Sequence, residues 1–242
     1  MLEPTAYIED SHRQLTVLPA LANTSFTRRR MLTASAIAAL AGMTGDAKLA
    51  FAQQAVIRRT NDQDLGPFYP ARLPADQDAD LTVIAGKTAR ALGRILYVSG
   101  RVTNLRGEPV GDAELEIWQA NAVGRYTHPA DVNTAPVDPN FDGYAKIRTG
   151  ADGSYRFKTV KPGAYPTGPG AMRPPHIHFD VRGKASRLVT QMYFAGEELN
   201  DKDRILQGAS RREGLIARYA APSGQQEPDA LVAEWNIALI AG

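Results

Sequence analysis

The sequence has no cysteine among its 242 residues. This absence excludes disulfide scaffolds, thiolate zinc sites, iron–sulfur clusters and cysteine nucleophiles. Any bound metal must therefore be held by oxygen atoms and imidazole nitrogens. Histidine is also scarce, with four residues in the chain, so the positions of these four carry much of the information about chemistry.

A strong charge imbalance and long apolar runs are lacking as well. The 28 Lys and Arg residues against 26 Asp and Glu leave a formal net charge of +2. This is too small for a nucleic-acid footprint, so we expect no nucleic-acid partner. No run reaches the roughly 20 apolar residues that cross a bilayer, so we expect no membrane span in the mature chain. The apolar fraction of 43% is enough to fill a core.

The N-terminal segment has the features of an export signal. Arg28, Arg29 and Arg30 directly precede an uncharged run at 31–43, and a small-x-small cleavage pattern follows at 50–52. The pattern predicts a twin-arginine-type signal over residues 1–52 that is removed, and a periplasmic or secreted protein. The alternative is a buried helix capped by arginines. The mature chain would then cover 53–242.

The mature chain is predicted to be rich in β-structure and to form one domain. Alternating apolar and polar residues between Gly, Pro and Asp turn signals predict strands at 95–102, 113–120, 154–160, 177–181, 188–194 and 231–240. Helical periodicity is weak, and 201–218 predicts one or two short helices. Residues 127–142 read as a long surface loop. The pattern predicts an all-β, single-domain β-sandwich with long active-site loops and few short helices.

His176 and His178 form the most informative motif. In a strand, residues i and i+2 point to the same face, so both imidazoles can reach one metal. The alternative is a pair of hydrogen-bonded structural histidines. The motif leaves the metal open, because it occurs in cupins, carbonic anhydrases, zinc hydrolases and non-haem iron sites. Asp180 would be splayed away as a third ligand. Tyrosine phenolates are other candidates and suit Fe(III).

Several longer motifs surround this pair in a fixed order. They lie at 66–70, 107–110, 115–126, 138–141, 152–166, 173–179 and 190–194, and include Gly66-Pro67-Phe68-Tyr69-Pro70 and Arg173-Pro174-Pro175-His176-Ile177-His178-Phe179. Over roughly residues 60 to 240, their order and spacing resemble the intradiol ring-cleavage dioxygenases. The branch they resemble most is that of the iron-bearing β subunits of protocatechuate 3,4-dioxygenases.

The resemblance implies a ligand set for non-haem Fe(III). The family's four iron ligands fall on Tyr126, Tyr165, His176 and His178. All four are present, whereas the family's non-catalytic partner subunits lack ligands. The alternative for each tyrosine is simple packing with its hydroxyl at the surface.

The resemblance also implies roles for residues around the metal. Arg173 matches the active-site arginine that stabilises developing negative charge, and Tyr165 matches the phenolate that accepts a substrate proton. Gln191 matches a residue of the catalytic pocket. Trp118 and Tyr69 are candidates for the substrate pocket, with core packing as the alternative for both.

The activity implied is cleavage of a catechol ring between its two hydroxyl-bearing carbons by O2, giving a cis,cis-muconate. The competing hypotheses are a non-catalytic β-sandwich binding module and a zinc hydrolase that uses the His-x-His motif. Residues 167–172 are two residues shorter than the matching segment of the β subunits and lack their tryptophan, which puts protocatechuate itself in doubt. Because all four ligands lie in one chain, we expect a homo-oligomer rather than an α/β pair.

Overall fold

The computed structural model describes residues 56–224 and 226–242. The predicted signal segment lies outside this part of the chain, and the boundary at residue 53 remains a prediction. Within the described residues, no helix has both the length and the apolar character needed to cross a membrane.

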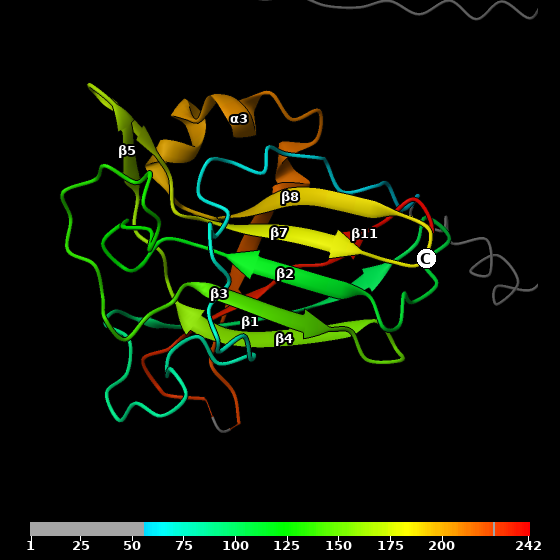
Figure 1. The fold of residues 1–242 in the computed structure, drawn as a ribbon. Coiled ribbons are helices and arrows are strands. Elements are labelled where there is room, and N and C mark those ends of the chain that lie inside the picture. The colour runs from blue at the N-terminus through cyan, green and yellow to red at the C-terminus, as the bar shows by residue number, and fades with distance from the viewer. Residues whose placement is uncertain (1–55, 225) are drawn as a thin grey trace, which may run out of the picture. The chain divides into compact units, whose positions relative to one another are not determined.

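Strands dominate the described structure (Figure 1). They are β1 (Ile95–Thr103), β2 (Glu114–Trp118), β3 (Tyr144–Arg148), β4 (Ser154–Val160), β5 (Tyr165–Gly168), β6 (Ala171–Arg173), β7 (His176–Arg182), β8 (Arg187–Phe194), β9 (Ile216–Ala220), β10 (Leu231–Glu234) and β11 (Ile237–Ala238). Between β8 and β9 lie the short helices η1 (Glu198–Lys202), α3 (Arg204–Gln207) and η2 (Arg212–Leu215). The predicted all-β class is confirmed, and the long loop at 127–142 contains no strand or helix.

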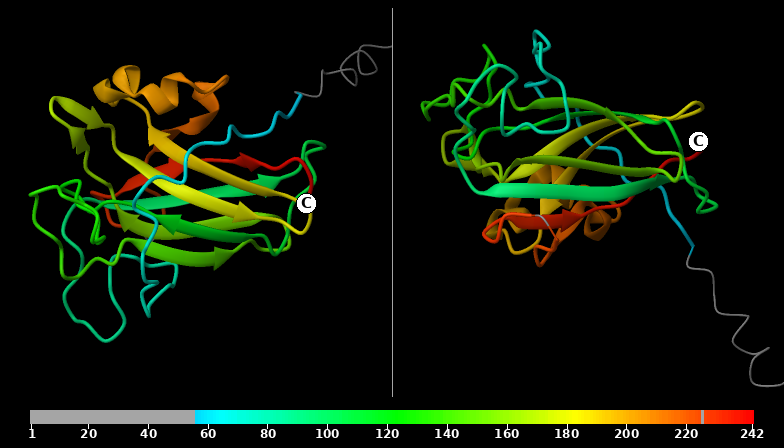
Figure 2. Two further views of the ribbon diagram at one scale, coloured as in Figure 1. Left: turned by 45° about the horizontal axis from the view of Figure 1, so that its top comes forward. Right: turned by 90° about the horizontal axis from the view of Figure 1, so that it is seen from below.

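The main sheet curls so that its two halves face each other (Figure 2). Its strand order is β11-β1-β10-β9-β8-β7-β2-β3, with β4 also paired to β1. The Phe179 ring on β7 lies 6.0 Å from Phe157 on β4 and 5.0 Å from the Trp235 ring. These contacts between distant strands define one sandwich core. The separate β5–β6 hairpin stands away from the sandwich beside the short helices (Figure 1).

The period of two along β7 separates packing from chemistry. Ile177, Phe179 and Val181 point into the core. His176, His178 and Asp180 therefore lie on the opposite face, which we call the outer face. These three side chains are nevertheless almost fully buried, because other segments cover them.

The last predicted strand, 231–240, is divided in the structure. β10 ends at Glu234 and β11 begins at Ile237, with the same parallel register against β1 on both sides. At the interruption, the Asn236 side-chain oxygen accepts a hydrogen bond from the backbone N–H of Arg101 on β1 at 2.8 Å. A side chain thus replaces one ladder hydrogen bond. Ala233, Trp235, Ile237 and Leu239 are buried and Leu231 is half-buried, so alternate residues of this segment face the core.

The predicted helical segment 201–218 is correct only in part. Its last three residues belong to β9, which pairs with β10 on one side and β8 on the other. Ala217 is buried there. Pairing on both sides overrides a local pattern that carries little strand signal.

Candidate functional site

The four predicted ligands, which we call the donor set, meet at one end of the outer face. His176 and His178 come from the start of β7, Tyr165 from the start of β5, and Tyr126 from the loop after β2. All four side chains are buried. Residues separated by up to 52 positions therefore come together, as the family resemblance implies.

The two imidazoles turn the same nitrogen toward each other. The Nε2 atoms of His176 and His178 lie 3.1 Å apart. His176 Nδ1 donates a hydrogen bond to the Pro174 carbonyl at 2.8 Å, which leaves its Nε2 with a lone pair. Burial, and then the nearby positive charge of Arg173, hold the pKa of His176 well below its usual value. Burial, and then His176, do the same for the pKa of His178. Both rings are thus neutral, as metal ligands must be.

The two phenol rings complete the group. The Tyr126 and Tyr165 rings meet edge to face at 5.4 Å. Tyr165 lies 5.5 Å from the His176 ring, and Tyr126 lies 6.3 Å from the His178 ring. Burial raises the pKa of both phenols, so a strong local positive charge is needed to remove their protons.

An unpaired buried oxygen indicates that the donor set suits a metal ion. Among the described residues, the Tyr126 hydroxyl is buried without a hydrogen-bond partner, and the Nε2 atoms of His176 and His178 face each other beside it. Such a buried hydroxyl costs free energy unless something binds it. The described residues contain no group of three or more His, Cys, Asp and Glu that could hold a metal. Here the tyrosines provide the further donors that the two histidines require.

Arg173 lies beside the donor set and is itself buried. Its Nη1 atom is 3.2 Å from His176 Nε2. Its Nη2 atom donates to Gln191 Oε1 at 2.9 Å and to the Tyr193 hydroxyl at 2.7 Å. The structure therefore brings both predicted catalytic neighbours, Arg173 and Gln191, to the donor set.

Two residues at this site were missed by sequence reasoning. Asp203 is buried and forms an ion pair with Arg173, its Oδ2 lying 2.8 Å from Arg173 Nε. Asp203 directly precedes α3 as its N-cap, and an Asp before a short apolar helix is a readable signal. Tyr193 lies two positions after Gln191 on β8, so the period of two places it on the same face.

The segment at 66–70 crosses over the donor set. Gly66 has a φ of 75°, and a Cβ built there would lie 3.0 Å from the His178 ring, so only glycine fits without a shift. The Phe68 ring stacks obliquely on Tyr126, with 4.6 Å between centroids. This segment thus shields the donor set from water.

The two predicted pocket residues, Trp118 and Tyr69, lie next to the donor set, but neither lines the cavity described in the next paragraph. Trp118 stacks on the His178 ring at 4.9 Å with 9° between the planes. Tyr69 meets Trp118 edge to face at 5.1 Å, and its hydroxyl donates to Glu116 at 2.6 Å. Burial and this hydrogen bond raise the pKa of Tyr69 to about 12. Their predicted contact with substrate remains a prediction.

A cavity of about 450 Å³ opens beside Tyr165 and Arg173. It is lined by residues 66–68, 131–133 and 165–168, with Asp64, Arg173 and Ile205. A larger hollow of about 770 Å³ lies over β1 and β4, away from the donor set. We assign substrate-sized space to the smaller cavity, because it alone of the two adjoins the converging polar groups.

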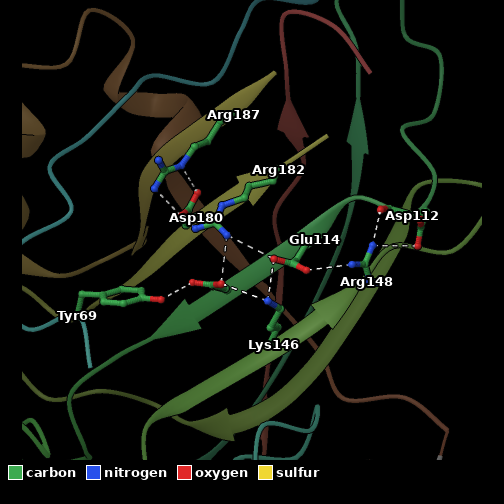
Figure 3. Close-up of polar contacts among 9 residues, drawn as sticks. Tyr69, Asp112, Glu114, Lys146, Arg148, Asp180, Arg182 and Arg187 are labelled. Atoms are coloured by element: carbon green, nitrogen blue, oxygen red, sulfur yellow. Dashed lines mark hydrogen bonds and ion pairs between the residues drawn. The ribbon is translucent and has the colours of Figure 1, made fainter. Parts of the chain in front are cut away.

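The other end of the outer face carries charged side chains, which we call the ionic cluster (Figure 3). Its members are Glu114, Glu116, Lys146, Arg148, Asp180, Arg182 and Arg187. Asp180 accepts hydrogen bonds from Arg182 at 2.6 Å and from Arg187 at 2.7 and 2.9 Å. Its carboxylate is therefore occupied by arginines, and it lies apart from the donor set as the strand geometry predicts.

Comparisons with known proteins bear on the same region. A family model described as "Dioxygenase" matches residues 65–241. The chain is 46% identical over 187 residues to the protocatechuate 3,4-dioxygenase beta chain of Burkholderia cepacia, covering 75% of this chain and 79% of the relative. It is 33% identical over 178 residues to the hydroxyquinol 1,2-dioxygenase of Nocardioides simplex, covering 67% of this chain and 56% of that relative.

A solved structure shares the fold. The dioxygenase domain of a dioxygenase carbohydrate-binding protein fusion from Streptomyces sp. SirexAA-E superimposes with a TM-score of 0.57 at 26% identity, over 76% of this chain and all of that chain. The family match spans both tyrosines, the His-x-His strand and Arg173. The chain belongs to the intradiol ring-cleavage dioxygenases, enzymes that open catechol-type rings.

Proposed function

We propose that the chain holds a non-haem Fe(III) ion through Tyr126, Tyr165, His176 and His178 and uses it to open a catechol-type ring with O2, giving a cis,cis-muconate. The observation that supports this proposal is the convergence of four buried donors, among which the Tyr126 hydroxyl has no protein partner. Two phenolates and two neutral imidazoles leave one positive charge on Fe(III), which a hydroxide or substrate oxygen would neutralise in this buried site.

Bound Fe(III) would supply a Lewis acid that holds the catechol oxygens and activates the ring toward O2. Tyr165 Oη would accept a catechol proton, because this phenol lines the cavity and lies beside Arg173. Burial raises the pKa of Tyr165, and the Arg173 cation partly offsets that rise. The phenol can therefore return to its protonated form as the substrate loses its proton.

Arg173 would stabilise negative charge that develops on the bound ring. Its guanidinium is buried, so its field is weakly screened by water. Gln191 would orient it, because Gln191 Oε1 accepts a hydrogen bond from Nη2 and Gln191 Nε2 donates to the Asp64 carbonyl at 2.7 Å. The Phe68 side chain would limit water at the reacting ring.

Metal analysis and visible spectra test the iron assignment. Protein purified from its own host should contain about one iron per chain and absorb visible light through tyrosinate-to-Fe(III) charge transfer. Tyr126→Phe should change that band. Tyr144→Phe is the matched control, because Tyr144 is a buried neighbour in the same aromatic cluster outside the donor set. Iron-replete protein without such absorption contradicts the proposal, and a zinc content with hydrolytic activity would support the zinc alternative.

Oxygen uptake tests the reaction and narrows the substrate. The relatives are named for protocatechuate, hydroxyquinol and catechol, so these three compounds form the panel. We expect uptake of one O2 per ring and an ultraviolet spectrum of a muconate. An extradiol product contradicts the proposal, and tight catechol binding without oxygen uptake or metal would favour the non-catalytic binding module.

Export through the twin-arginine route is a second part of the proposal, carried by the arginines and cleavage pattern within residues 1–52. Cell fractionation should find the protein in the periplasm or medium, and N-terminal sequencing should begin near Gln53. Replacing Arg28, Arg29 and Arg30 together by lysine should leave the protein in the cytoplasm. Normal export of that variant contradicts the route.

Assembly into a homo-oligomer is the third part. The complete donor set within one chain supports it, because no partner subunit is needed to supply a ligand. Sedimentation of the purified chain should give the mass of two or more chains, and active protein with the mass of one chain would contradict this expectation.

A further inference from the structure

Asp203 is a buried carboxylate to which the proposed reaction gives no role. Its side chain is 3% exposed and that of Arg173 is 9% exposed. The two groups form a fork, with Arg173 Nε 2.8 Å from Oδ2 and Nη2 3.2 Å from Oδ1. A bidentate pair of this kind fixes the plane of the guanidinium as well as its position.

The carboxylate is held in place independently of Arg173. Asp203 is the N-cap of α3, and its Oδ1 accepts the backbone N–H of Leu206 at 2.7 Å. Leu206 is fully buried in the core. The N-cap hydrogen bond therefore fixes the position of the carboxylate, and the carboxylate in turn fixes the guanidinium.

The remaining contacts orient the guanidinium. Nη2 is engaged by Asp203, Gln191 and Tyr193, and Nε is engaged by Asp203. Nη1 contacts none of these three residues and instead faces His176 of the donor set at 3.2 Å. Nη1 is thus the nitrogen directed toward the reaction centre.

We propose that Asp203 is a positioning residue that fixes the Arg173 guanidinium with Nη1 toward the bound substrate. The proposal rests on the role assigned to Arg173 above. It makes the short helix α3 part of the catalytic apparatus, although no residue of α3 belongs to the donor set. The Asp203 carboxylate, fixed at the start of α3, thereby holds the Arg173 cation where negative charge develops.

Asp203→Asn is the central variant. Asparagine is as good an N-cap as aspartate, so α3 keeps its start while the charge and one acceptor toward Arg173 are lost. We expect kcat to fall about 100-fold, with KM within about threefold of wild type, because the lost interaction acts mainly in the transition state. Iron content and the visible band should be unchanged, because the four ligands remain.

Two comparisons separate positioning from a merely structural role. In a double-mutant cycle with Arg173→Gln, the double variant should be no slower than Arg173→Gln alone, because Asp203 acts only through the arginine. Asp203→Glu keeps the charge but is a poorer cap. It should retain a higher kcat than Asp203→Asn while melting at a lower temperature.

Asp180→Asn provides the matched control. Asp180 is equally buried and paired with two arginines on the same face, but it lies outside the donor set. This variant should keep wild-type kcat. The proposal is overturned if Asp203→Asn keeps kcat within threefold of wild type, if the losses multiply in the double variant, or if kcat follows melting temperature across the Asn and Glu variants. An inactive, iron-free wild type would instead overturn the proposed function.

Discussion

The two ends of the outer face of β7 and its neighbours share one strand geometry and have opposite chemistry. The donor set has neutral imidazoles and phenols, and its Tyr126 hydroxyl has no hydrogen-bond partner among the described residues. The ionic cluster has seven charged side chains that pair with one another (Figure 3). His178 and Asp180, two positions apart on β7, belong to the different ends.

The difference shows how one face serves two purposes. A group can bind a metal or substrate only if the protein leaves its lone pair unsatisfied, which costs stability. Carboxylates that already accept hydrogen bonds from arginine and lysine have no such free lone pair, and they act on stability and on the alignment of the strands. We therefore expect substitutions at the donor end to change activity and substitutions at the ionic end to change stability.

The strongest test of this contrast is His178→Gln at the donor end. Removing one of four ligands should lower kcat by about 1,000-fold or more and abolish stoichiometric iron binding. The metal-free variant should still unfold cooperatively, because His178 takes part in no ion pair. Iron analysis, kinetics and urea unfolding measure the three quantities. An active, iron-replete variant would remove His178 from the donor set.

Asp180→Asn tests the ionic end. Its carboxylate is 1% exposed, whereas its two arginine partners are 41% and 57% exposed. Because the partners are partly exposed, breaking these ion pairs should cost less stability than breaking a wholly buried pair. We expect the free energy of unfolding to fall by about 2 kcal/mol. The kcat of the folded enzyme should stay within twofold of wild type. Glu213→Gln, in a pair where Glu213 is 80% exposed, is the control and should not change stability measurably.

Acid should weaken the ionic end through the same carboxylate. Burial alone would raise the pKa of Asp180, but hydrogen bonds from Arg187 and Arg182 outweigh it and hold the pKa below its usual value. A depressed folded-state pKa contributes stability above the unfolded-state pKa of about 3.9, and this contribution is lost as pH falls through the folded value.

The stability difference between wild type and Asp180→Asn should thus be constant from pH 7 to about pH 5 and shrink below about pH 4. Urea unfolding at several pH values measures it. A stability difference that stays constant down to pH 2 would mean that ionisation of the Asp180 carboxylate does not cause it.

The smallest expected effect lies at Tyr69, where the two ends meet. Tyr69→Phe removes the hydrogen bond to Glu116 but leaves the ring against Trp118, so the free energy of unfolding should fall by about 1 kcal/mol. We expect kcat and KM to stay within about twofold. A large rise in KM would instead support the predicted contact between Tyr69 and substrate, and would weaken the division between the two ends.

Local pattern was sufficient for much of the fold. The strand at 154–160 has the same limits in the structure as in the sequence pattern, and those at 95–102 and 188–194 differ by one residue. The joint position of His176 and His178 on one face also followed from the period of two. These features depend on side-chain alternation and turn residues over a few positions, which a sequence displays directly.

Features that depend on distant partners were not predictable in this way. At the break between Glu234 and Ile237, the Asn236 side chain meets β1. The Tyr69 hydroxyl reaches Glu116 only because the segment at 66–70 crosses the outer face.

The residues that can do chemistry are recognisable in the sequence alone: no thiolate is available, two histidines share a face, and family motifs mark Tyr126, Tyr165 and Arg173. The partner that each of them meets depends instead on how the strands and helices pack. The ion pair of Arg173 with Asp203 spans 30 positions and depends on where α3 begins against the core. Side-chain alternation is local, whereas such a contact depends on sheet curvature, strand register and helix docking together, and no short stretch of sequence specifies these.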